Sequence, residues 1–406
     1  MNVQSQSTAE AHYSPLYFLA ALGAGGLVVT FFMYLMFWVP HKGQPVPVFE
    51  DIWAYTQTAN LSGQIAVAVA LFGVAIFAIL HFYLIIWNLR QSADFRKSAA
   101  YEKLLKSNAE TQTMAAPLAL AMSVNVGFIV GLVFVPQLWS VVEYLFPAAI
   151  IAFVAIGYYA FQLLARFFGG VMVEGGFNSS ANNSFAQLLP AFALSMVAVG
   201  LAAPSAMSQT KWIVGASEIL STFFIVTSVI MTMIAIVMAV QSIVKNGTAP
   251  EAAPTLMVVI PFITVLTIAL LRQNHGLHTA FEVHTSAGET FSFLTQMLSI
   301  QVLFALLGLL VLKRQNYKEM FLSNTGKRSA GSYALVCPGV ALSVMIHFWV
   351  NKGLVATGLI AKFGVAYWAF TAPALILQLA MIILLFKLHD LHFARPKIAS
   401  GAMPAE

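Results

Sequence analysis

The pattern of hydrophobic and polar positions divides the chain into ten long apolar stretches separated by short polar segments. A helix needs about 20 apolar residues to cross a hydrocarbon core of about 30 Å. The predicted spans cover residues 16–39, 65–87, 117–135, 145–168, 185–203, 219–239, 256–271, 291–312, 332–350 and 365–386. No long hydrophilic stretch lies between them. The pattern therefore predicts an all-α integral membrane protein, with one transmembrane domain over residues 1–406.

The composition excludes several classes of protein. Apolar residues make up 60% of the chain and charged residues 9%, against about 25% charged residues in ordinary soluble domains. So few charges cannot cover a surface that faces water, which argues against a soluble enzyme, a nucleic-acid-binding protein and a disordered scaffold. The single cysteine, Cys337, excludes an internal disulfide framework and a cluster of several cysteine ligands.

The basic residues predict the orientation in the membrane. Fifteen of the twenty lie after even-numbered spans or in the C-terminal tail, namely Arg90, Arg96, Lys97, Lys103, Lys106, Arg166, Lys245, Lys313, Arg314, Lys318, Lys327, Arg328, Lys387, Arg395 and Lys397. The loops after odd-numbered spans hold Lys42, Lys211, Arg272, Lys352 and Lys362. Because basic loops stay in the cytoplasm, we expect a multi-pass protein of the inner (plasma) membrane with both termini cytoplasmic. The basic runs 90–106 and 313–328 would contact lipid headgroups; attracting anions to a pore is the alternative.

A proline recurs near the start of every odd-numbered span. These residues are Pro15, Pro117, Pro190, Pro261 and Pro338, at intervals of 102, 73, 71 and 77 residues. The even-numbered spans contain only Pro147 and Pro373, at unmatched positions, which argues against chance coincidence. Two spans return the chain to its starting side, so the pattern predicts five parallel helical hairpins in a pseudo-five-fold arrangement around a central pore. The proline helices would form the inner ring, each kinked at its proline.

The polar residues of these inner helices are uncharged. No Asp, Glu, Lys or Arg occurs within the five odd-numbered stretches. Proton-coupled carriers usually bury an ionisable group, so an uncharged pore favours a passive conduit or a carrier coupled elsewhere. The candidate pore-lining residues are Ser123, Asn125, Ser195, Thr264 and Ser343. Their hydroxyl and amide donors suit a small anion, although hydroxyl groups in membrane helices also bond to their own backbone.

The ten spans, the repeated prolines and the predicted cytoplasmic termini resemble the tellurite-resistance/dicarboxylate transporter family, which includes TehA-like proteins and slow-type anion channels. The resemblance covers roughly residues 13–388. It implies a channel or transporter for a small anion, without enzymatic activity or cofactor, that assembles as a homotrimer with one pore in each protomer. It also implies a pore-blocking phenylalanine on the ninth helix beside the kink. Cys337 occupies that position here, so Phe192 and Phe262, which lie near other prolines, are the alternative gate residues.

Two interpretations of Cys337 remain open. A lone cysteine on an apolar helix is commonly a small buried hydrophobic residue. Its position beside Pro338 instead suggests a thiol in the pore that contacts a soft substrate. A sulfur or selenium oxyanion would be such a soft substrate, and a dicarboxylate is the other candidate for the transported anion.

The histidines raise a function of another class, a membrane subunit of a quinone- or haem-linked respiratory oxidoreductase. His81, His347, His389 and His392 lie in or beside spans, without the repeated spacing of paired haem ligands. His81 is expected at a helix interface, and His347 either in the pore or in the packed interior. The loop residues His275, His278, Glu282 and His284 could bind a metal, and a hydrated loop is the alternative.

Overall fold

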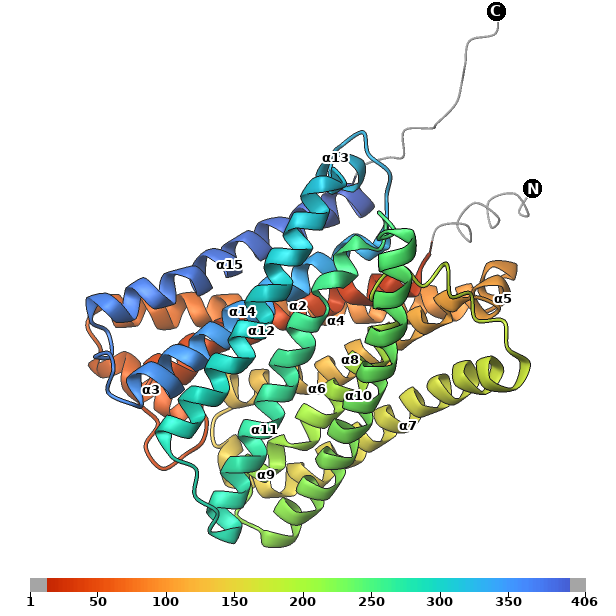
Figure 1. The fold of residues 1–406 in the computed structure, drawn as a ribbon. Helices are drawn as coiled ribbons and strands as arrows, with labels where there is room; N and C mark the ends of the chain where they lie inside the picture. The colour runs from red at the N-terminus through yellow and green to blue at the C-terminus, as the bar shows by residue number, and fades with distance from the viewer. Residues whose placement is uncertain (1–12, 395–406) are drawn as a thin grey trace, which may run out of the picture.

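The computed structural model describes residues 13–394, and this part of the chain is helical and contains no strand. Ten of its helical segments are long and apolar enough to cross a membrane, which confirms the predicted number of spans (Figure 1). The odd-numbered spans contain α2 (Phe18–Trp38), α6 (Ala115–Phe134), α8 (Leu189–Leu201) followed by α9 (Ala203–Met207), α11 (Val259–Phe281) and α14 (Val336–Phe348). The even-numbered spans are α4 (Leu61–Phe95), α7 (Val142–Glu174), α10 (Lys211–Asn246), α12 (Ala287–Arg314) and α15 (Val365–His389). Three short helices are α3 (Phe49–Thr58), α5 (Ala99–Leu105) and α13 (Tyr317–Phe321).

Several helices extend beyond the apolar stretches that predicted them. Hydrophobicity marks the part of a helix that crosses the bilayer, whereas capping residues determine where the helix begins and ends. The Asn60 side chain accepts a hydrogen bond of 2.9 Å from the Gly63 N–H at the start of α4. Gly175 and Gly247, with φ of 75° and 72°, end α7 and α10 in a conformation that favours glycine.

The odd-numbered spans form the interior of the bundle. α2 packs against α6, α6 against α8, α8 against α11, α11 against α14, and α14 against α2, so the contacts form a closed circuit. Each of these helices also packs against the long helix that follows it in the chain. In their most apolar 18-residue windows, the odd-numbered spans are 44–83% buried and the even-numbered spans 17–39% buried. The even-numbered helices therefore present most of their apolar side chains outward, where a membrane protein meets lipid.

The five repeated prolines lie in the first turn of the inner α-helices or directly before it, and not in the helix interior, where a proline would produce the expected kink. Pro117, Pro190, Pro261 and Pro338 occupy the second or third residue of α6, α8, α11 and α14. Each of these helices follows a 3-10 helix: η2 (Asn108–Met114), η4 (Ala186–Leu188), η5 (Ala253–Met257) and η6 (Ala330–Leu335). Pro15 begins η1 (Pro15–Tyr17), directly before α2. The first N–H groups of a helix have no partner within it, so proline is tolerated there and fixes the backbone for the first turn.

The chain enters η1 and leaves α15 on the same side of the bundle, as ten crossings require (Figure 1). We call this side the terminal side. Arg395 and Lys397, two of the residues that predict orientation, lie outside the described residues. The C-terminal ends of the inner helices lie on the opposite side.

Close contact between α2 and α4 depends on a glycine. The Phe31 ring of α2 packs directly over Gly73 of α4, and a Cβ at Gly73 would overlap the ring atoms. Gly127 of α6 has no neighbouring atom within 4 Å of the corresponding Cβ position. The two glycines therefore make a matched pair, one crowded and one free.

We expect Gly73→Ala to lower the stability of the protein by about 1–3 kcal/mol, because Phe31 must leave its position. The measurement is thermal unfolding of the purified protein in detergent. Gly127→Ala adds the same methyl group in open space and should leave the unfolding temperature unchanged or slightly raised. An equal loss in both variants would contradict a specific contact between Phe31 and Gly73.

Candidate functional site

A cavity of about 610 Å³ lies among the five inner helices. Residues from α2, α6, α8, α11 and α14 contribute to its wall, together with α7, α9 and the loops on the side opposite the termini. A volume of this size is typical of a binding site for a small molecule. The helices that carry the repeated prolines thus surround a common space.

The cavity is closed toward the terminal side. Its deepest lining residues are Leu22, Met122, Phe192, Pro261 and Cys337, and all lie within two turns of the start of the α-helix that carries them. Phe192 has the largest side chain of this group and is only 3% exposed.

Residues closer to the helix starts are packed between the inner helices, beyond the closed end of the cavity. Phe18, Leu118 and Val336, which precede the cavity on α2, α6 and α14, are at most 1% exposed. The cavity therefore ends at the level of Phe192.

The opposite end of the cavity is open and basic. Arg272, His275 and His278 of α11 line it, and so do Lys352 in the π-helix η7 (Trp349–Val355) and His41 in the loop after α2. His275, His278 and Lys352 are exposed, so this end reaches the solvent. No aspartate or glutamate occurs among the lining residues.

Arg272 is the basic residue held within the packed helices. Its Nη1 donates a hydrogen bond of 2.7 Å to the Val199 carbonyl. Val199 lies in the last turn of α8, where carbonyl groups lack partners within the helix and carry partial negative charge. Within residues 13–394, Arg272 forms no ion pair. The carbonyl thus positions the guanidinium while its positive charge remains available to an anion.

Arg272 and Lys352 correct the expectation of an uncharged wall. The apolar stretch ends at Leu271, but α11 continues for ten more residues, to Phe281. The helix carries Arg272 inside the bundle, although hydropathy alone assigned it to a loop. The sequence contains a usable signal, because no proline interrupts the residues between Leu271 and Phe281 and a helical pattern can continue through them.

Two of the five predicted polar residues line this cavity. The Asn125 amide donates to the Ala121 carbonyl at 3.2 Å and lies 3.8 Å from Met196 Sδ. The Thr264 hydroxyl donates to the Ile260 carbonyl at 3.1 Å and accepts a bond of 2.6 Å from Gln301 Nε2. Asn125 is therefore the better placed neutral donor.

The three predicted serines lie elsewhere, against neighbouring groups. His81 Nδ1 donates to the Ala21 carbonyl at 2.7 Å, and its Nε2 lies 2.9 Å from the Ser123 hydroxyl. Ser195 donates to the Phe192 carbonyl, and Ser343 donates to the Ala374 carbonyl of α15, both at 2.8 Å. These hydroxyls connect helices or bond to their own backbone, and none of the three residues lines the cavity.

The structure separates the three gate candidates. Phe192 and Cys337 line the deep end of the cavity, whereas Phe262 is 4% exposed and packs in the core outside its wall. Among the repeated prolines only Pro261 lines this cavity. Pro15, Pro117, Pro190 and Pro338 do not contact the cavity, and they lie where the inner α-helices begin.

The histidines are dispersed. His347 is fully buried among Tyr34, Phe37 and Trp38 and does not line the cavity. The Nδ1 atoms of His278 and His284 lie 3.1 Å apart. In the described part of the chain, no three His, Cys, Asp or Glu side chains are grouped to hold a metal.

Comparison of the sequence with protein-family models and with curated proteins finds no match.

Proposed function

We propose that this protein is a channel or transporter for a small anion, and that the anion passes along the cavity between the five inner helices. The observation that carries this proposal is Arg272, which has no acidic partner among residues 13–394 and lies on the wall of the central cavity. An unpaired charge in such surroundings is costly. The position of the Arg272 guanidinium is consistent with a site at which a bound anion supplies the negative charge that the protein lacks there.

The surroundings of Arg272 support passage in preference to permanent binding. Within residues 13–394 a single hydrogen bond positions the guanidinium. Further inside, one N–H of the Asn125 amide faces only the weak acceptor Met196 Sδ, so it can turn to an anion. The basic residues at the open end, Lys352, His275 and His278, raise the local concentration of anions. Stepwise interaction of moderate strength permits an ion both to enter and to leave.

The same proposal covers the arrangement of all ten spans in the membrane. The five inner helices and their outer partners form five parallel hairpins with pseudo-five-fold order, as in the tellurite-resistance/dicarboxylate transporter family. The distribution of basic residues supports a cytoplasmic terminal side in an inner (plasma) membrane, with the open end of the cavity facing out. The protein then acts without enzymatic activity, as a homotrimer with a separate pore in each protomer. The anions to examine include sulfur and selenium oxyanions and dicarboxylates.

The direct test is ion flux in liposomes that contain the purified full-length protein. We expect the reversal potential to follow the gradient of the anion. A reversal potential that follows the cation gradient would refute the proposal. An absorption spectrum of the same sample separates it from a respiratory subunit, because stoichiometric haem would give a Soret band.

The single cysteine provides a second test of charge selection in the cavity. Cys337 lies at the deep end and is the only thiol in the chain, so no other position reacts. We expect an anionic methanethiosulfonate reagent to modify it roughly tenfold faster than a cationic reagent of similar size, because the basic entrance concentrates anions. Labelling followed by mass spectrometry measures both rates. Cys337→Ser should remain unlabelled, and equal rates for the two reagents in the native protein would contradict anion selection.

A further inference from the structure

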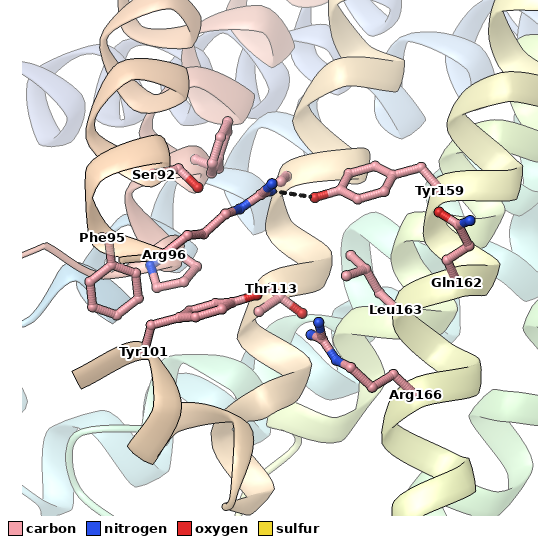
Figure 2. Close-up of a pocket in the computed structure, with 12 residues that line it drawn as sticks. Ser92, Phe95, Arg96, Tyr101, Thr113, Tyr159, Gln162, Leu163 and Arg166 are labelled. Carbon is pink, nitrogen blue, oxygen red and sulfur yellow. Dashed lines mark hydrogen bonds between the residues drawn. The ribbon is translucent and has the colours of Figure 1, made fainter. Parts of the chain in front are cut away.

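A second cavity, of about 220 Å³, lies on the terminal side between α4, α5, α6 and α7 (Figure 2). It is separate from the central cavity, and the two share no lining residue. Its wall carries two cations and several neutral hydrogen-bonding groups: Ser92, Arg96, Tyr101, Tyr159, Gln162 and Arg166. We call it the Arg96 pocket.

Arg96 spans the pocket from α4 to α7. It directly follows the last residue of α4, and its Nη2 donates a hydrogen bond of 2.9 Å to the Tyr159 hydroxyl (Figure 2). Among residues 13–394 it forms no ion pair. The adjacent Lys97 differs, because it pairs with Asp94 at 3.3 Å and its side chain is 76% exposed. The Tyr159 hydroxyl thus orients Arg96 while leaving its charge uncompensated.

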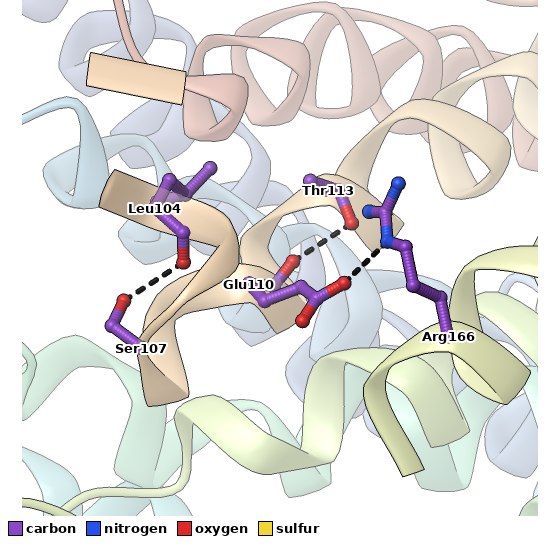
Figure 3. A network of polar contacts seen from close by, with 5 residues as sticks. All are labelled: Leu104, Ser107, Glu110, Thr113 and Arg166. Atoms are coloured by element: carbon purple, nitrogen blue, oxygen red, sulfur yellow. Dashed lines mark hydrogen bonds and ion pairs between the residues drawn. The ribbon is translucent and has the colours of Figure 1, made fainter. Parts of the chain in front are cut away.

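Arg166 is the second cation, and a buried carboxylate holds it in place. Its Nε lies 2.5 Å from Oε1 of Glu110, whose side chain is 7% exposed (Figure 3). The Thr113 hydroxyl donates to the Glu110 backbone carbonyl at 2.7 Å, which stabilises this turn of η2. The ion pair engages Nε, and the Tyr101 side chain, which also lines the pocket, is a second hydrogen-bond partner of the Arg166 guanidinium. With Glu110 neutralising one of the two arginines, the pocket keeps one positive charge.

The position of the pocket along α7 indicates its depth. Arg166 lies 24 residues beyond Val142, the first residue of α7. At about 1.5 Å per residue it is about 36 Å along the helix axis, beyond a hydrocarbon core of about 30 Å. The Arg166 end of the pocket therefore lies at the level of the lipid headgroups on the terminal side, and its Tyr159 end lies near the edge of the hydrocarbon core.

We propose that the Arg96 pocket binds a phosphate group. Two guanidinium groups with neighbouring hydroxyl and amide donors match the geometry and charge of phosphate oxygens, and basic pockets between helices at this depth suit anionic headgroups. The group comes either from an anionic phospholipid or from soluble phosphate. In both cases the ligand links the end of α4 to α7 through Arg96 and Arg166.

The test uses the purified full-length protein and two probes, phosphatidylglycerol and inorganic phosphate. Native mass spectrometry measures retained phosphatidylglycerol against a phosphatidylcholine background, and thermal unfolding measures stabilisation by inorganic phosphate. We expect Arg96→Gln to weaken binding about tenfold or more, since a hydrogen bond to a charged group is lost. Arg96→Lys keeps the charge but not the fork of donors, and it should give an intermediate value.

Lys97→Gln is the matched control, with the same change of charge one residue further along, and it should bind as the native protein does. Retained phosphatidylglycerol that inorganic phosphate does not displace identifies the lipid as the ligand. Stabilisation by inorganic phosphate without retained lipid identifies a soluble phosphate. Binding of neither probe, or equal weakening in Arg96→Gln and Lys97→Gln, would overturn the proposal.

Discussion

Replacement of Arg272 by glutamine is expected to lower anion flux at least about tenfold in liposomes. Two unit charges about 4 Å apart interact by about 4 kcal/mol at an effective dielectric constant of about 20, and a tenfold change requires about 1.4 kcal/mol. Losing only part of the interaction between Arg272 and the anion is therefore enough to lower the flux tenfold. Glutamine removes the positive charge and keeps an uncharged amide donor at position 272, so the side chain stays polar.

The control for Arg272→Gln is Lys211→Gln. Lys211 begins α10 on the same side of the bundle, is exposed, and does not line the cavity. Both variants lose one positive charge, so a general effect of net charge would slow both equally. Arg272→Lys should keep most of the anion selectivity, and Arg272→Glu should shift the reversal potential toward that of the cation. Native flux in Arg272→Gln would contradict the assigned role.

The spans could be predicted from the sequence because a bilayer crossing depends on local composition. The ends of the helices could not, since polar residues such as those from Arg272 to Thr279 continue α11 beyond its apolar stretch. Because the predicted span ends at Leu271, the sequence prediction also missed the basic residue on the cavity wall. Arg272 directly follows Leu271, so hydropathy assigns it to a loop. The structure shows that the Val199 carbonyl of the neighbouring α8 holds its side chain inside the bundle.

The direction of a side chain around a helix also requires the neighbouring helices. Asn125 and Ser123 lie two residues apart on α6, so they point in different directions. Asn125 lines the cavity, whereas Ser123 bonds to His81 of α4. The spacing from the proline identified the correct segment for both residues. Only the packing of α4 against α6 separates the residue on the cavity wall from the residue at the interface.

The largest gain of flux is expected from Phe192→Ala. The Phe192 ring is the largest group at the closed end of the cavity, two residues after Pro190. Apolar constrictions stop ions by excluding the water that accompanies them. Removing the ring should raise anion flux roughly tenfold, which corresponds to a barrier lowered by about 1.4 kcal/mol. Flux in liposomes under a fixed anion gradient is the measurement, with Phe192→Leu as a milder variant that keeps more of the packing.

Phe262→Ala is the control that distinguishes the opening of a gate at Phe192 from a general loosening of the core. Phe262 is 4% exposed and Phe192 is 3% exposed, and both follow a proline at the start of an inner helix, but Phe262 does not line the cavity. Truncation of either ring should cost about 3–5 kcal/mol of stability, because each leaves a space in a packed interior. Only Phe192→Ala should also raise the flux. An equal rise in both variants would show that the gain comes from disordered packing. If Phe192→Ala conducts as the native protein does, Phe192 is not the barrier, and the barrier lies nearer the terminal side, among residues such as Phe18 and Leu118.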